Sequence, residues 1–338
     1  MKIGVVGDVH WSKYSSILRT RGEKYSTRLE NCIQTFNWIE QEMKDKYDYL
    51  IYVGDVFDKP ELNAEEISAL GEIDWGTKPH IFLTGNHEMG INNLSFSSSK
   101  VFKLDATNDV IDRPCKDDFV DFEICYLPYI REEDRKSIEE YFGIPTKPRL
   151  IVSHNDISGF QMGAFISKAG FEIEDIQLNC TLYLNGHLHN GGKVADKIYN
   201  VGNITGQNFS EDATKYTHQM FIVDTDTMTI ETYENPYALN FYKLDSSHNI
   251  EKFNFKSNSV VTLSALESKV EEVKNYLDNN KKILTYRVLS IPEAKDFVDL
   301  SDNITLSVDH LEKFKEFTIS QLGTSDIVID ELKEVCHG

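Results

Sequence analysis

KIGVVGDVH, residues 2–10, places a short apolar run directly before Gly7, Asp8 and His10. The same layout recurs further along the chain in YLIYVGD (49–55), HIFLTGNHE (80–88), LIVSH (150–154) and TLYLNGHLH (181–189). Short runs rich in Val, Ile, Leu, Tyr and Phe are typical of buried strands. Helical periodicity lies between several of these runs, and this alternation predicts an α/β core with a partly parallel sheet.

Helices and further strands are expected around these runs. The spacing of Thr27 and Glu30 predicts a capping box, after which Leu29, Cys32 and Phe36 share one helical face. Helices are predicted over 63–70, 132–142, 265–278, 308–322 and 327–335, and a strand is predicted over 282–290. The pattern changes near Asn235 and Pro236, which predicts a core domain over 1–238 and a smaller α+β domain over 239–338.

Composition limits the functional classes. No stretch of the 338 residues resembles a membrane span, and the N-terminus enters a strand without the layout of a signal peptide. Five scattered cysteines with no CxxC pair predict a reducing, cytoplasmic setting. The net charge of −20 argues against a broad basic surface for nucleic-acid phosphates.

The polar clusters after the strands predict a metal centre. In open α/β sheets the carboxyl ends of the strands gather ligand-binding residues, so these distant segments are expected to converge. Asp, Asn and His suit a pair of divalent ions. One ion is predicted to take Asp8, His10, Asp55 and His189, and the other Asp55, Asn86, His154 and His187.

Two ions that share Asp55 would lower the pKa of a bridging water, which could then attack phosphorus in line. His87 lies beside the predicted ligands and is the expected group to stabilise the transition state or to protonate the leaving oxygen. Each cluster alone has an ordinary explanation as a turn, a core histidine or an exposed loop. All five clusters in this order, each after a strand, favour the metal centre.

These motifs resemble those of the calcineurin-like metallophosphoesterases, whose signature is Asp-x-His, Gly-Asp, Gly-Asn-His-Glu, His and Gly-His-x-His. The resemblance covers residues 1 to about 235. It implies a four-layered α/β/β/α core and a two-metal site, usually with manganese.

Within that family the chain is most similar to the SbcD-type DNA repair nucleases, which are bacterial and phage relatives of the eukaryotic double-strand-break repair nuclease. The similar segments are Gly54-Asp55-Val56-Phe57-Asp58, Leu127-Pro128-Tyr129, Tyr199-Asn200-Val201-Gly202 and Phe209-Ser210-Glu211. The resemblance implies a manganese-dependent double-strand exonuclease and single-strand endonuclease for DNA repair and recombination. It also implies a C-terminal capping and partner-binding domain, a homodimer and an SbcC-like coiled-coil ATPase partner.

The substrate contacts are less defined. Asp58 stands where some relatives carry a phosphate-contacting His. Lys13 and Arg21, with the nearby Arg19, Lys24 and Arg28, are candidates for a local phosphate contact, the alternative being a solvated loop and helix face. The acidic charge favours a second interpretation, a phosphoesterase for nucleotides or other small phosphodiesters. A protein phosphatase is disfavoured by the Gly-His-x-His pair, and a purely architectural role is disfavoured by the intact ligand set.

Overall fold

The computed structural model describes residues 1–17, 22–162 and 165–293. Arg19, Arg21 and the helices predicted over 308–322 and 327–335 therefore lie outside the described residues. By its contacts the chain divides into two compact units, Met1–Ile291 and Pro292–Gly338. Within the described residues, no helix is long and apolar enough to cross a membrane.

The first sheet contains six strands in the order β16-β15-β1-β2-β3-β6. Its parallel part consists of β1 (Lys2–Val6), β2 (Tyr49–Tyr52), β3 (His80–Leu83) and β6 (Asn108–Ile111). The antiparallel hairpin of β15 (Gln219–Asp224) and β16 (Thr229–Glu234) extends it on the side of β1.

The second sheet also has six strands, in the order β13-β14-β12-β9-β8-β7. Its central strands are parallel: β14 (Ile198–Asn200), β12 (Leu182–Asn185), β9 (Arg149–Ser153) and β8 (Glu123–Leu127). Antiparallel strands close both edges, namely β13 (Gly192–Ala195) and β7 (Cys115–Asp118). Both sheets are therefore mixed.

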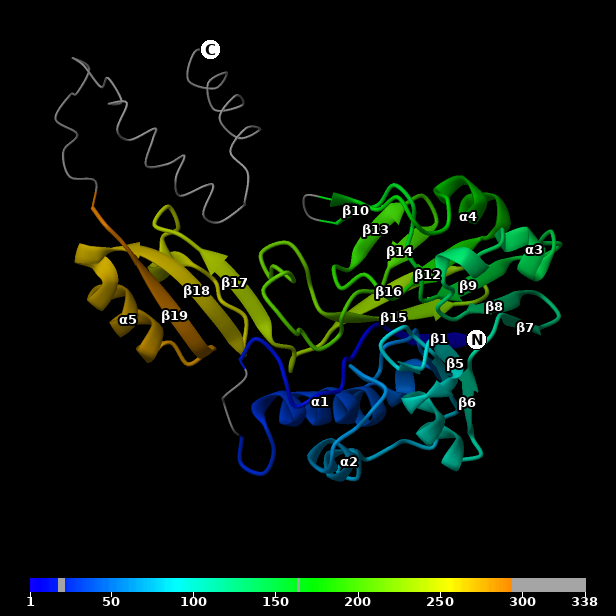
Figure 1. Ribbon diagram of the computed structural model, residues 1–338, viewed down its shortest axis with the longest axis horizontal. Helices are drawn as coiled ribbons and strands as arrows, with labels where there is room; N and C mark the ends of the chain where they lie inside the picture. The colour runs from blue at the N-terminus through cyan, green and yellow to red at the C-terminus, as the bar shows by residue number, and fades with distance from the viewer. Residues whose placement is uncertain (18–21, 163–164, 294–338) are drawn as a thin grey trace, which may run out of the picture. The chain divides into compact units, whose positions relative to one another are not determined.

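Side-chain alternation along the strands separates three apolar layers. Ile51 and Val152 belong to a core between the two sheets, whereas Leu50 and Tyr52 pack on the opposite face of the first sheet and Ile151 on the opposite face of the second. Helices α1 (Thr27–Asn37) and α2 (Ala64–Leu70) cover the first sheet, and α3 (Ile138–Phe142) and α4 (Ile173–Asn179) cover the second (Figure 1). This arrangement confirms the predicted α/β fold with its four layers.

Helix α1 buries the predicted face, since Leu29, Cys32 and Phe36 are all inaccessible to solvent. The predicted capping box of Thr27 and Glu30 is wrong, because the helix is capped one residue earlier, at Ser26. Ser26 is the N-cap and accepts a hydrogen bond from the Leu29 amide at 3.2 Å, while Glu30 accepts from amides that precede the helix. Ser and Thr are both good N-caps, so the sequence alone does not choose between neighbours.

Two other predicted helices have different boundaries. The segment 132–142 is a short 3₁₀ turn (Glu132–Asp134) followed by α3, because Ser137 and Glu140 form a capping box that starts a new helix. The segment 265–278 begins as the end of strand β18 (Ser259–Leu266), and helix α5 spans Val270–Asn279. A small hairpin, β4 (Met89–Gly90) and β5 (Asn93–Ser97), was not predicted.

After β16 the chain forms a third, three-stranded sheet. Strands β17 (Asn240–Leu244), β18 and β19 (Ile283–Ile291) are all parallel, and α5 packs on one face. Phe241 and Val260 on this sheet share an apolar cluster with Ile17. The proposed boundary at 238 and a separate cap over 239–338 remain predictions.

Candidate metal centre

The predicted metal ligands lie at the carboxyl ends of five parallel strands. Each cluster begins within three residues of the end of β1, β2, β3, β9 or β12. The loops that carry the first two clusters are joined, since the amides of Val9 and His10 donate to the carbonyl of Asp55 at 3.1 and 2.9 Å. Segments that are far apart in sequence are thereby held at one site.

Three of these residues have backbone conformations that are unusual for residues other than glycine. His10, Asp55 and His187 have φ values of +50°, +47° and +71°. Non-glycine residues rarely occupy this region, and such conformations concentrate at functional sites. The turns therefore direct these side chains into the site at a local conformational cost.

Glycine permits the close approach of neighbouring ligand segments. A Cβ atom on Gly85 would lie 2.1 Å from Oδ1 of Asp55, and one on Gly54, which has φ +96°, would lie 2.2 Å from Nδ1 of His154. Both positions exclude any side chain. The glycines at these two positions are thus required by the close packing of the ligand segments.

Four predicted ligands converge around Asp55 on one side. His154 Nε2 lies 3.0 Å from Asp55 Oδ2 and 3.2 Å from Asn86 Oδ1. His187 Nδ1 lies 3.0 Å from the same Asn86 oxygen. Adjacent ligands of an octahedral ion with bonds of about 2.1 Å are about 3 Å apart. These spacings match the second predicted ion.

The other side of Asp55 gathers the first predicted set. His10 Nε2 lies 4.0 Å from Asp55 Oδ2, and the rings of His10 and His189 are 4.6 Å apart. Asp8 Oδ2 and His10 Nε2 are buried and have no hydrogen-bond partner among the residues that the structure describes. Buried polar atoms are almost always satisfied, so these two fit an ion at this position.

The donor set also fits a cation electronically. The Nδ1–H group of His154 donates to the Val53 carbonyl at 2.7 Å, so its Nε2 lone pair would face two oxygen acceptors. Only a proton or a metal ion relieves that contact. Two groups of side chains have ligand atoms close enough to hold an ion, and they share Asp55: one is His10, Asp55 and His87, and the other is Asp55, His154 and His187.

Each remaining imidazole has a carboxylate partner on its outer nitrogen. His10 Nδ1 donates to Asp58 at 3.1 Å, and His189 Nδ1 donates to Glu211 at 2.7 Å. His187 Nε2 lies 3.3 Å from Asp156. Such partners fix the tautomer and orientation of metal-binding histidines.

Burial and nearby charges strongly shift the pKa values of His154, Asp55 and Glu88. Burial lowers the pKa of His154, but the carboxylates of Asp55 and Asp8 outweigh it and raise that pKa to about 9. Burial likewise opposes ionisation of Asp55, yet the facing His154 holds its pKa well below the usual range. Burial and the nearby Asp55 raise the pKa of Glu88 to about 7. In the absence of an ion, the site thus retains a proton on His154.

His87 differs from the predicted ligands in exposure. Its side chain is 44% exposed, whereas those of His10 and His154 are inaccessible. Its Nδ1–H donates to the main-chain oxygen of Asp58 at 3.0 Å, and the ring lies 4.7 Å from that of His10. The imidazole is near enough to His10 and Asp55 to be a ligand. Its exposure favours substrate contact, and its role remains a prediction.

The candidate phosphate contacts are mostly engaged within the protein. Lys13 Nζ lies 3.9 Å from a carboxylate oxygen of Glu65. Arg28 is buried and donates to the carbonyls of Val9 and Gly206, both at 2.7 Å, so its prediction as a surface phosphate contact is wrong. The carboxylate of Asp58 accepts a hydrogen bond from His10. Arg21 lies outside the described residues.

Sequence reasoning gave no role to several residues of the site. Glu88 accepts hydrogen bonds from the amides of Val56, Phe57 and Gly85 and so ties two motif turns together. Glu88 belongs to a recognised motif, so its presence was a usable signal. Glu211 and Asp156 had weaker signals, because their function depends on which histidine the fold places beside them.

A family model described as calcineurin-like phosphoesterase matches residues 1–260. A search of curated proteins gives no match.

Two solved structures are distantly similar. One crystal structure aligns at 11% identity over 69% of this chain and 98% of its own, with a TM-score of 0.41. The other is purple acid phosphatase PPD1 from yellow lupin (Lupinus luteus) seeds, with 14% identity, 70% of this chain covered and a TM-score of 0.36. This chain spans 46% of that phosphatase.

Proposed function

Since this chain belongs to the calcineurin-like phosphoesterase family, we propose that its metal-dependent hydrolysis is directed at the phosphodiester bonds of DNA. The observation that supports hydrolysis most directly is the pair of ligand groups that share Asp55. The proposal for DNA is supported by the secondary motifs that resemble SbcD-type nucleases, such as Leu127-Pro128-Tyr129.

Two sets of side chains have separate metal-binding roles around the scissile phosphate. Asp8, His10, Asp55 and His189 would hold one ion, and Asp55, Asn86, His154 and His187 the other. When bound, two divalent ions supply charge neutralisation for the phosphate oxygens and an activated water. We propose manganese for both, in keeping with the resemblance.

His87 is the proposed proton donor. Because its Nδ1–H is held by the Asp58 carbonyl, its Nε2 is the nitrogen available to the leaving oxygen. The partial exposure of this ring suits a group that meets the substrate. Asp58 and Glu211 act as positioning residues for His10 and His189.

A comparison of two substrates tests the proposal. Purified protein with Mn²⁺ is incubated with linear duplex DNA and with bis-p-nitrophenyl phosphate. The expected result is loss of duplex DNA from its ends, together with hydrolysis of the small ester. Activity on the ester alone would contradict the DNA assignment but leave the phosphodiesterase intact.

That second outcome corresponds to a second candidate function, hydrolysis of nucleotides or other small phosphodiesters. The net charge of −20 favours it, as does the engagement of Lys13 and Arg28 with other protein groups. Small substrates do not require the basic surface on which DNA binding usually depends.

We also propose that the chain acts with an ATPase partner and with a second copy of itself. An SbcC-like coiled-coil ATPase would supply much of the DNA contact that this acidic chain lacks, and the nuclease would act as a homodimer. Multi-angle light scattering of the purified chain is expected to give the dimer mass. Co-expression with such an ATPase is expected to yield a complex with higher activity on duplex DNA. A monomer, or failure to form the complex, would contradict the corresponding part.

A further inference from the structure

A cavity of about 580 Å³ lies next to the metal centre. Tyr129 joins the two, because it lines the cavity and its ring lies 6.1 Å from that of His187. Met89, another lining residue, donates its amide to the Asn86 carbonyl at 3.4 Å. A molecule in this cavity would therefore lie beside the ligands of the second predicted ion.

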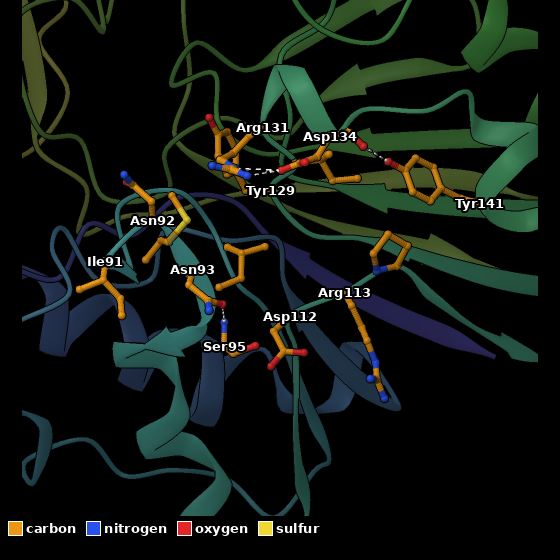
Figure 2. A pocket seen from close by; sticks show the side chains of 14 residues that line it. Ile91, Asn92, Asn93, Ser95, Asp112, Arg113, Tyr129, Arg131, Asp134 and Tyr141 are labelled. Atoms are coloured by element: carbon orange, nitrogen blue, oxygen red, sulfur yellow. Dashed lines mark hydrogen bonds and ion pairs between the residues drawn. The ribbon is translucent and has the colours of Figure 1, made fainter.

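The hairpin of β4 and β5 forms one wall of the cavity, opposite Arg131, Asp134 and Tyr141 (Figure 2). Its two turn residues, Ile91 and Asn92, have φ values of +48° and +54°. Such a turn favours Asn and Gly, whereas a β-branched residue in this conformation is a rare outlier. Ile91 is nonetheless 82% exposed, so it gains little from packing in the protein alone.

Three of the four charged side chains that line the cavity form ion pairs. Asp112 pairs with Lys100, and Asp134 pairs with Arg131 at 2.6 Å. The fourth, Arg113, is exposed and has no ion pair or hydrogen bond within the part of the chain that the structure describes. In a chain with a net charge of −20, an exposed guanidinium on the wall of this cavity favours a phosphate-bearing ligand.

The remaining lining groups suit a nucleobase. Tyr129 offers an aromatic face, and exposed Ile91 offers an apolar surface, both of which suit the flat face of a base. The amide of Asn92 can pair with a base edge. The volume is within the range of sites for small organic molecules.

We propose that this cavity binds the nucleoside next to the scissile phosphate and that Arg113 contacts a further phosphate of the same strand. The inference rests on the proposed function, because it assigns a substrate class to the same centre. A base can enter such a cavity only when it is unpaired, so the cavity selects single-stranded or frayed ends.

Two esters with the same leaving group separate this subsite from the chemistry. p-Nitrophenyl thymidine 5′-phosphate carries one nucleoside, and bis-p-nitrophenyl phosphate carries none. With Mn²⁺, the wild-type protein is expected to show a KM at least about tenfold lower for the thymidine ester, since one good base contact contributes roughly this much. Equal KM values for the two esters would overturn the proposal.

Ser95→Trp is designed to fill the cavity from the β5 wall, where Ser95 is exposed. It is expected to raise the KM for the thymidine ester about tenfold with little change in kcat. Asn92→Ala removes the amide with a smaller disturbance and is expected to raise the same KM. Ser246→Trp, the same change at an exposed position in a different cavity, is the matched control and should leave that KM unchanged.

Binding gives a readout that does not depend on turnover. Calorimetry with thymidine 5′-monophosphate is expected to show weaker binding to Ser95→Trp than to the wild type and to Ser246→Trp. Unchanged binding and unchanged KM in both Ser95→Trp and Asn92→Ala would overturn the subsite. If the wild type hydrolyses neither ester, the proposed function fails, and nucleotide binding to these variants still decides the subsite.

Discussion

Asp55 occupies the central position among the residues of this site. Its Oδ2 lies 3.0 Å from His154 and 4.0 Å from His10, and its Oδ1 accepts a hydrogen bond from the His87 amide at 3.0 Å. The strained φ of +47° at this position directs the carboxylate between two groups of donors. Metal binding and the placement of the candidate proton donor therefore depend on the same side chain.

Replacement of His87 by Ala tests the division of labour between binding and proton transfer. Because its imidazole is partly exposed and is absent from the predicted ligand set, His87→Ala is expected to retain bound metal. Loss of a general acid typically slows the chemical step by about 10²- to 10⁴-fold. Metal content measured by mass spectrometry, together with kcat, checks both parts. Persistent cleavage, or loss of an ion, would show that its role is different.

The carboxylate partners of the histidines are predicted to act on one ion each. Glu211→Gln weakens the hydrogen bond to His189 and is expected to lower affinity for the first ion about 10- to 100-fold. Asp156→Asn is the matched variant for His187 and the second ion. Titration with Mn²⁺ followed by electron paramagnetic resonance distinguishes the two sites. Loss of the same ion in both variants would contradict the assignment.

Individual residues of the site were predictable to different degrees. Asp8, Asn86 and His154 each lie within three residues of the end of a strand, so local sequence was enough to group them with the site. Asp58 and Glu211 were visible in the sequence, but their contacts with His10 and His189 depend on tertiary packing. Arg28 was misassigned because a basic residue on an amphipathic helix is normally exposed, whereas here tertiary hydrogen bonds bury it.

At the scale of elements, Arg28 connects α1 to two functional loops. Its guanidinium donates to the Val9 carbonyl in the loop after β1 and to Thr205 and Gly206 in the loop after β14, each at 2.7 Å. The loop after β1 carries Asp8 and His10. Helix α1 thus holds part of the metal centre through a buried side chain.

Substitution of Arg28 by Leu is expected to destabilise the fold. The Gly206 carbonyl and Asn31 Oδ1 lose their donor, whereas the Val9 carbonyl still accepts from Thr205. Each buried acceptor left without a partner costs about 1–3 kcal/mol, which gives a total of about 2 kcal/mol or more. Chemical denaturation measures the change. Lys24→Met, which alters an exposed basic residue near the same helix, is the control and should leave the midpoint nearly unchanged. Equal effects of the two substitutions would contradict this role for Arg28.

Elements were predicted well where one strong pattern dominated. Strands β1, β2, β3, β9 and β12 were located because each is a continuous apolar run. The hairpin of β4 and β5 was missed because its turn contains Ile91 in place of the usual Asn or Gly. Strand β18 was partly taken as helix because its end and α5 are separated only by a short 3₁₀ turn, Glu267–Lys269.

For the molecule as a whole, binding of metal is coupled to binding of protons. In the metal-free protein the pKa of His154 is raised to about 9. Below this pH a proton must leave before His154 can bind an ion, so affinity for Mn²⁺ is expected to rise about tenfold per pH unit from pH 7 to 9 and then to level off. Calorimetry between pH 7 and pH 9 measures the affinity for Mn²⁺. A pH-independent affinity would contradict the assignment of His154 as a ligand.

The same shift predicts the stability of the metal-free protein. The pKa of His154 is higher in the folded than in the unfolded state, where it is about 6.5. Its contribution to stability is therefore complete below pH 6.5 and is lost as the pH rises through 9. Bound metal replaces the proton and should remove this dependence.

The two-ion centre around Asp55 is tested most directly by anomalous scattering from crystals soaked in Mn²⁺. The expected result is two peaks about 3.5–4 Å apart, with Asp55 in contact with both. A single peak in crystals of a fully active sample, or two peaks with no ligand in common, would contradict the account.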